Sequence, residues 1–202
     1  MDPQSPDADE FTLHAWVDES MRGPMDGRPG IYLMAAVVAD PSACEQTRDS
    51  LRALRQGKAR RLHWRHESEL RQEKIAALVA ELDAFNIVVV GVPLDSKRQE
   101  RARRQCMERL LYELDQIGVT AVLLESRHPA LNARDKTMAA ALYSKAVVSS
   151  ALRVEFALPN EEPMLWVPDA VAGIVNAYRS DGDDALRLIV GSVIREIDIK
   201  LS

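Results

Sequence analysis

The sequence predicts an α/β fold in which a mixed sheet carries helices on both faces. Two apolar segments, 12–17 and 31–39, flank a loop with three glycines and two prolines, a pattern typical of an antiparallel hairpin. After this hairpin, apolar runs alternate with amphipathic segments. The 202 residues, 47% of them apolar, suffice for one well-buried domain. We therefore expect a disordered acidic tail at 1–10 and a single domain at 11–202.

The segments that follow the hairpin predict two helices with a short strand between them. Pro41 and Ser42 are typical of a helix start, so we expect a helix at 41–56. A short strand is expected at 61–65. The helix expected at 68–84 places its apolar side chains on one face, namely Ile75, Leu78, Val79 and Leu82.

An unbroken β-branched run at 87–92 predicts a central strand, because a strand covered on both faces has no polar side. The polar segment that follows it is expected to be a helix, and the next apolar run another buried strand. The remaining elements are expected in this order: a helix at 97–116, a strand at 119–125, a helix at 136–149, a strand at 152–157, and two closing helices at 169–178 and 184–197.

Composition excludes several classes of protein. The formal net charge of -5 argues against binding of nucleic acid by bulk charge, so any such surface must be a local patch. Cys44 and Cys106 lack the spacing of a metal site or a secreted disulfide scaffold, and we expect both to be reduced and buried. No signal segment opens the sequence, and the longest apolar run, 87–93, is too short to span a bilayer. We expect a cytoplasmic protein with no membrane partner.

Acidic residues stand where apolar segments end or begin. Asp18 and Glu19 close the first expected strand, Glu125 closes the strand at 119–125, and Asp169 opens a helix of small residues. Two carboxylates about 4 Å apart repel by roughly 4 kcal/mol at an effective dielectric near 20, so converging acids require a cation. Oxygen ligands suit Mg²⁺ or Mn²⁺, and such ions can assist hydrolysis of a phosphodiester.

Each of these acids also has a structural alternative. Asp18 can begin a turn, and Glu19 points away from Asp18 by strand alternation, so it can instead pair with a cation. Asp169 can stabilise a helix N-terminus behind a proline that fits the first helical position. Asp95 and Asp135 can each cap a helix.

The stretch 52–66 contains six basic residues and no acid, which indicates a local basic surface in an acidic protein. Trp64 within it can stack on a base or lie in the core. A second basic run, 97–109, includes two glutamates and is typical of the solvent face of a helix. The candidate contacts to substrate phosphates are Arg60, Arg61, His63, Arg65 and Arg127.

Five short motifs resemble, in order and approximate spacing, a bacterial group of unknown function within the RNase H-like superfamily, over about 11–178. They are Asp18-Glu19-Ser20, Leu62-His63-Trp64, Val92-Pro93-Leu94-Asp95-Ser96-Lys97, Leu123-Leu124-Glu125-Ser126-Arg127 and Asp169-Ala170-Val171-Ala172-Gly173.

The resemblance implies an RNase H-like fold and a divalent-metal-dependent nuclease acting on RNA or DNA. Asp18, Glu125 and Asp169 would be catalytic, and with Glu19 they would hold Mg²⁺ or Mn²⁺. Glu125 stands where the group usually has Asp. The alternative is a binding or regulatory module that kept the fold and lost the chemistry.

Overall fold

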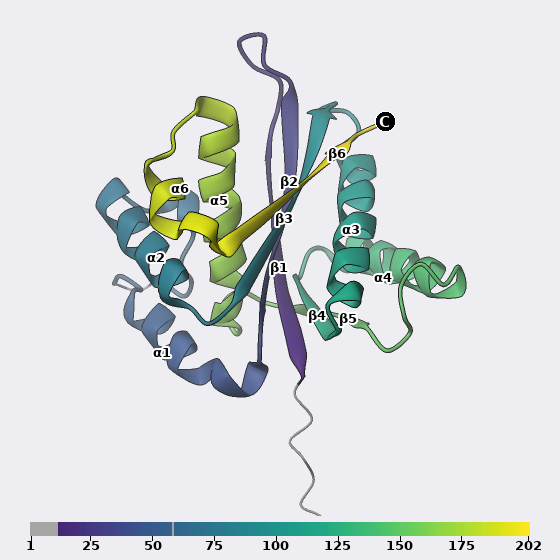
Figure 1. The fold of residues 1–202 in the computed structure, drawn as a ribbon, viewed down its shortest axis with the longest axis horizontal. Coiled ribbons are helices and arrows are strands. Elements are labelled where there is room, and N and C mark those ends of the chain that lie inside the picture. The colour runs from purple at the N-terminus through teal and green to yellow at the C-terminus, as the bar shows by residue number, and fades with distance from the viewer. Residues whose placement is uncertain (1–11, 58) are drawn as a thin grey trace, which may run out of the picture.

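The computed structural model describes residues 12–57 and 59–202, and the tail expected at 1–10 lies outside them. Six strands form one sheet in the order β5-β4-β1-β2-β3-β6 (Figure 1). The strands are β1 (Leu13–Arg22), β2 (Gly30–Ala39), β3 (Phe85–Leu94), β4 (Val119–Glu125), β5 (Arg153–Ala157) and β6 (Ile194–Lys200). β2 pairs antiparallel with β1 and β3, whereas β1–β4, β4–β5 and β3–β6 are parallel. The predicted mixed sheet with an initial antiparallel hairpin is confirmed.

Helices cover both faces of this sheet, as the alternating pattern predicts. One face carries α1 (Glu45–Ala53), α2 (Glu69–Glu81), α5 (Trp166–Asp181) and α6 (Ala185–Val190), and the other carries α3 (Gln99–Gln116) and α4 (Pro129–Ser144) (Figure 1). No helix within the described ranges is long and apolar enough to cross a membrane.

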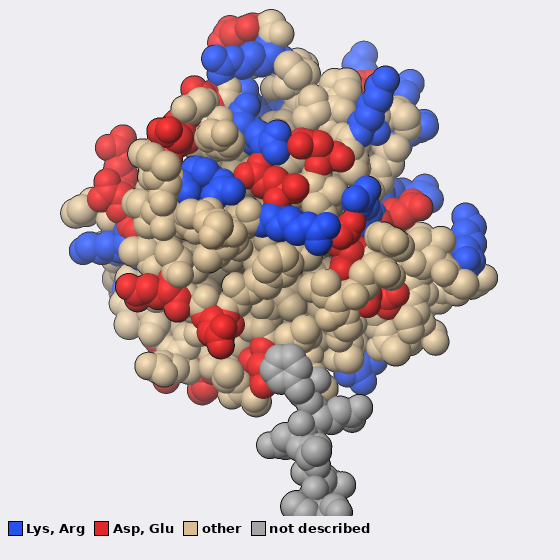
Figure 2. All heavy atoms as spheres, in the orientation of Figure 1, with Lys and Arg blue, Asp and Glu red and all other residues tan. Residues whose placement is uncertain are grey.

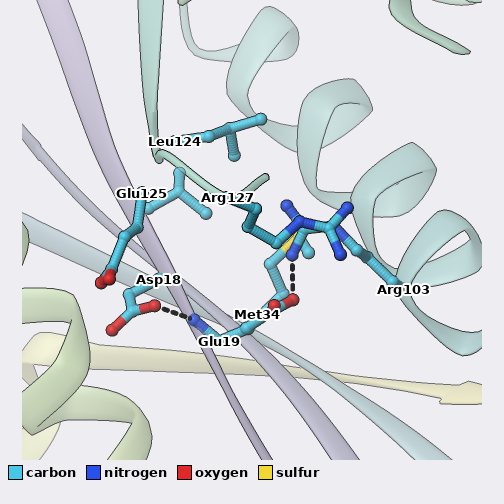
Figure 3. Close-up of a pocket in the computed structure, with 8 residues that line it drawn as sticks. Asp18, Glu19, Met34, Arg103, Leu124, Glu125 and Arg127 are labelled. Carbon is cyan, nitrogen blue, oxygen red and sulfur yellow. Dashed lines mark hydrogen bonds and ion pairs between the residues drawn. The ribbon is translucent and has the colours of Figure 1, made fainter. Parts of the chain in front are cut away.

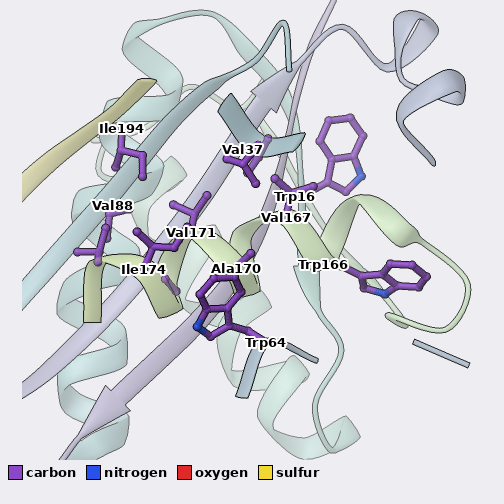
Figure 4. Close-up of a cluster of buried hydrophobic side chains, with 14 of the residues drawn as sticks. Trp16, Val37, Trp64, Val88, Trp166, Val167, Ala170, Val171, Ile174 and Ile194 are labelled. Atoms are coloured by element: carbon purple, nitrogen blue, oxygen red, sulfur yellow. The ribbon is translucent and has the colours of Figure 1, made fainter. Parts of the chain in front are cut away.

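Strand alternation gives each face its own hydrophobic core. Trp16, Val37 and Val88 pack against α5 and its neighbouring helices (Figure 4). The side chains that follow them in sequence point to the other face, and Val17, for example, belongs to the core under α3 and α4. All of β2 is buried, because it lies inside the sheet and both its faces are covered. Cys44 and Cys106 are buried and unbonded, as expected.

Trp64 belongs to the core rather than to the surface. Its side chain is buried against α5, where Figure 4 shows it beside Ala170. A Cβ atom at Gly173 would lie 2.0 Å from the Trp64 ring, so the indole occupies space that only glycine leaves open. The small residues of α5 therefore let the 61–66 segment approach the helix closely.

Two strand assignments differ from expectation. β1 continues to Arg22 because it stays paired with β2 as far as Arg22 opposite Ile31. Asp18 therefore lies within the strand and not at its end. Residues 61–65 form no strand; the chain turns there, and a short 3-10 helix follows at Trp64–His66.

The helix expected at 184–197 is wrong in its second half. Gly191 adopts φ 54°, a conformation that L-residues rarely take, and the helix ends before it. The following residues alternate apolar and polar side chains and form β6, which pairs with the edge of β3. The helix expected at 136–149 begins earlier, at Pro129, which fits the first helical position.

Candidate functional site

The two adjacent acids of β1 belong to opposite layers of the molecule. Asp18 follows the alternation of Trp16 and faces the α5 layer, whereas Glu19 follows Val17 and faces the α3 layer. In Figure 3 their carboxylates point away from each other. The same alternation, applied to the sequence, predicted that Glu19 would point away from Asp18.

Asp18, Glu125 and Asp169 line one cleft of about 370 Å³ on the α5 face. In the parallel pair β1–β4, Val17 stands opposite Leu124, so the next residues along both strands are Asp18 and Glu125. Figure 3 shows the two carboxylates on the same side of the sheet. Asp169 comes from the first turn of α5, whose apolar face packs on β1.

Burial is the main influence on the pKa of Asp18 and of Asp169. Burial raises the pKa of Asp18 well above its ordinary value, and the charges of Glu125 and Asp169 raise it further. A hydrogen bond from the Glu19 N–H to Asp18 Oδ1, 2.7 Å long, opposes the shift. Burial also raises the pKa of Asp169, although the Trp64 N–H donates to its Oδ2 at 2.9 Å. The cleft thus holds a surplus of carboxylate charge.

The 61–65 segment supplies cations to this cleft. Arg61 Nη1 lies 3.1 Å from Glu125 Oε1, and His63 Nδ1 lies 3.4 Å from Asp169 Oδ2. Arg65 also lines the cleft, and its Nη2 donates to the carbonyl oxygen of Met21 at 3.1 Å. Two of the three acids therefore have a basic partner from one segment, whereas Asp18 enters no salt bridge within the described ranges.

Glu19 takes part in a buried network on the α3 side of the sheet. Its Oε2 accepts hydrogen bonds from Tyr32 and from Arg103, the contact that Figure 3 marks. Arg103 Nη2 also pairs with Asp135 Oδ2 at 2.9 Å, and both of these side chains are almost fully buried. Asp135 lies inside α4, so its expected role as a helix cap is wrong.

Arg127 joins the same network, with its guanidinium 3.0 Å from Asp135 and 2.7 Å from Glu100. It still lines a small cavity of about 100 Å³ together with Asp18 and Glu125 (Figure 3). Arg60, by contrast, is exposed and does not line the acidic cleft.

Sequence reasoning missed the part played by Arg103. It lies in a polar run that looks like the solvent face of a helix, yet it is only 4% exposed. The helical spacing of α3 indicates its burial, because Arg103 stands between the buried positions Ala102 and Cys106 on the apolar face.

The chemistry of the cleft fits a hard divalent cation. Its acids are oxygen donors of the kind that Mg²⁺ and Mn²⁺ prefer, and burial together with the neighbouring charges of Glu125 and Asp169 raises the pKa of Asp18, a shift that a bound cation would oppose. Within the described part of the chain, no three His, Cys, Asp or Glu side chains are arranged as a ready-made metal centre. Ion binding would therefore require the carboxylates to adjust, in particular Glu125, which contacts Arg61.

Comparison with known proteins identifies the fold. No family model matches this sequence, and no curated protein matches it. The structure is similar to that of a chain in the structure of the PCNA:RNase HII complex from Archaeoglobus fulgidus, with a TM-score of 0.51 and 15% identity over 90% of this chain and 81% of that chain. At this identity the likeness shows the fold alone, which is RNase H-like, as the five motifs predicted.

Proposed function

We propose that this chain is a divalent-metal-dependent nuclease that hydrolyses phosphodiester bonds of RNA or DNA. The observation that carries the proposal is the single cleft that Asp18, Glu125 and Asp169 line together with Arg61, His63 and Arg65. Acids able to hold a cation stand beside bases able to hold a phosphate. The likeness to an RNase HII structure supports this assignment at the level of the fold.

Asp18, Glu125 and Asp169 would hold Mg²⁺ or Mn²⁺, and such an ion supplies positive charge that stabilises the transition state of phosphodiester hydrolysis. Strand alternation directs Asp18 toward the α5 layer, and the hydrogen bond from the Glu19 N–H holds its carboxylate. Glu19, the fourth expected ligand, is held by Arg103 on the other face, so we propose that it anchors β1 beneath the site.

The basic residues would act on the substrate. Arg61 and Arg65 stand at the cleft and can contact phosphate oxygens, and Arg61 must then leave Glu125. An exchange of partners keeps both groups neutralised, because the guanidinium passes from a carboxylate to a phosphate while the carboxylate gains a cation. His63, paired with Asp169, can orient that acid or a phosphate.

A second candidate is a catalytically silent binding module. The observation that favours it is the contact of Glu125 with Arg61 and of Asp169 with His63, which gives two of the three acids a basic neighbour. In such a module Arg61 and His63 would keep their contacts to Glu125 and Asp169, and the cleft would take up no ion.

Metal uptake distinguishes the two candidates. We expect calorimetry to show Mn²⁺ binding to the parent protein and cleavage of labelled RNA or DNA in its presence. Asp18→Asn should lose cleavage, whereas Asp83→Asn, which removes an exposed acid just after α2, should keep it. If the parent takes up neither Mn²⁺ nor Mg²⁺ even with nucleic acid present, the nuclease proposal is wrong and the binding module remains.

A further inference from the structure

A second cavity, of about 760 Å³, lies between the outward faces of α3 and α4. It is on the layer opposite the acidic cleft, and we call it the α3–α4 groove. Its apolar surface comes from α4, chiefly Ala133, Met138 and Ala141. Three arginines also line it, namely Arg101, Arg104 and Arg134.

The α3–α4 groove is electropositive although the chain carries a net charge of -5. None of its three arginines enters a salt bridge with a described residue, and Arg101 only donates to Ser202 Oγ. The two acids of the groove, Glu100 and Asp135, already have arginine partners. Figure 2 shows several Lys and Arg side chains, with Asp and Glu among them, on the side of the molecule that carries α3 and α4. The free cations therefore call for an anionic ligand.

The α3–α4 groove is connected to the acidic cleft through Arg127. This side chain lines the small cavity beside Asp18 and Glu125, and its guanidinium contacts Glu100 and Asp135, which line the groove. A strand whose scissile bond lay at the acidic cleft would pass Arg127 on its way to the groove.

We propose that the α3–α4 groove binds a nucleotide of a single-stranded segment of nucleic acid, away from the bond to be cleaved. The proposal rests on the nuclease function above. Arg104 and Arg134 would contact phosphates, and Met138 with its neighbouring alanines would contact the base or sugar. A peptide of Asp and Glu offers the charge but no planar apolar group for this surface, whereas a nucleotide offers both in one unit.

The test is fluorescence anisotropy with a labelled single-stranded oligonucleotide of about 20 nucleotides, longer than one typical binding site, in EDTA so that nothing is cleaved. The variant is Arg104→Gln/Arg134→Gln. The control is Lys74→Gln/Arg153→Gln, which removes the same charge from exposed positions on α2 and at the start of β5. Metal uptake of all three proteins is measured by calorimetry.

We expect Arg104→Gln/Arg134→Gln to bind the oligonucleotide about fivefold more weakly or worse, with a salt slope lower by about 1.4, since each lost phosphate contact removes about 0.7. The control variant should bind like the parent, and polyglutamate should not displace the oligonucleotide. The groove proposal is overturned if the parent does not bind the oligonucleotide, if polyglutamate displaces it, or if Arg104→Gln/Arg134→Gln binds like the parent. If that variant loses affinity but the parent takes up no metal, the groove proposal stands and the nuclease proposal fails.

Discussion

The buried carboxylate of Asp18 lowers the stability of the folded protein when it is ionised beside the other acids of the cleft. Its folded-state pKa lies well above 3.8, first through burial and then through the charges of Glu125 and Asp169. Protonated Asp18 therefore stabilises the folded state fully at a pH below its pKa in the unfolded chain. This contribution to the free energy of unfolding is lost as the pH rises through its pKa in the folded protein. At neutral pH an ionised Asp18 costs stability when no cation is bound.

Asp18→Asn should consequently raise the melting temperature in EDTA, because the amide keeps the hydrogen bond from the Glu19 N–H and carries no charge. The gain over the parent should widen as the pH rises from about 4 to about 8. Asp83→Asn serves as the control and should change little. A large fall in the melting temperature of Asp18→Asn would identify Asp18 as a structural residue.

Gly173 gives a second prediction for a single residue. Replacing it with Ala would gain about 1 kcal/mol of helix propensity, but the new methyl group would collide with Trp64. Overpacking of a full core typically costs about 1 to 3 kcal/mol, so we expect a net loss of stability in urea unfolding. Adding Trp64→Phe, a smaller ring, should recover part of the loss. Full stability of Gly173→Ala alone would show that the indole moves freely.

At the scale of one segment, the short turn at 61–65 brings several basic side chains to the cleft together. Arg61 competes with any ion for Glu125, so Arg61→Gln should tighten Mn²⁺ binding about 3- to 10-fold, or roughly 0.7 to 1.4 kcal/mol, the size of a partly exposed ion pair. Calorimetry measures this directly. Arg60→Gln, outside the cleft, should leave the affinity unchanged. Equal affinities for the parent and Arg61→Gln would mean that Glu125 does not bind the ion.

The elements β1, α3 and α4 are joined by the Arg103 network. Arg103→Gln would remove the cation that Glu19 and Asp135 share and leave Asp135 with Arg127, so we expect a cost of about 3 kcal/mol, the lower end for breaking a buried pair. Urea unfolding should show a loss of this size, whereas Arg153→Gln, at an exposed position, should lose less than about 0.5 kcal/mol. A small loss for Arg103→Gln would mean that water replaces the guanidinium.

For the whole molecule, the sequence predicts most of the sheet, because the apolar runs at 31–39 and 87–92 have no alternative to a covered strand. β6 was missed because its polar positions also suit a helix, and only the open edge of β3 decides between them. The acids of the cleft were named from sequence, and their common location depends on the strand order β4-β1, which no local pattern contains. The ion pair between Arg103 and Asp135 could not be predicted for the same reason, since it joins two separate helices.

Because Asp18 and Glu19 face opposite layers, the register in which β1 pairs with β2 decides which acid the cleft receives. Sliding β1 by one residue against β2 would turn the Glu19 side chain toward the α5 layer and the Asp18 side chain toward the α3 layer. Asp is one methylene shorter than Glu, so neither layer would receive the acid that it now holds. The register in which β1 pairs with β2 therefore fixes which carboxylate faces which layer. A residue inserted within β1 would exchange the two acids, whereas one inserted in the loop would leave them in place.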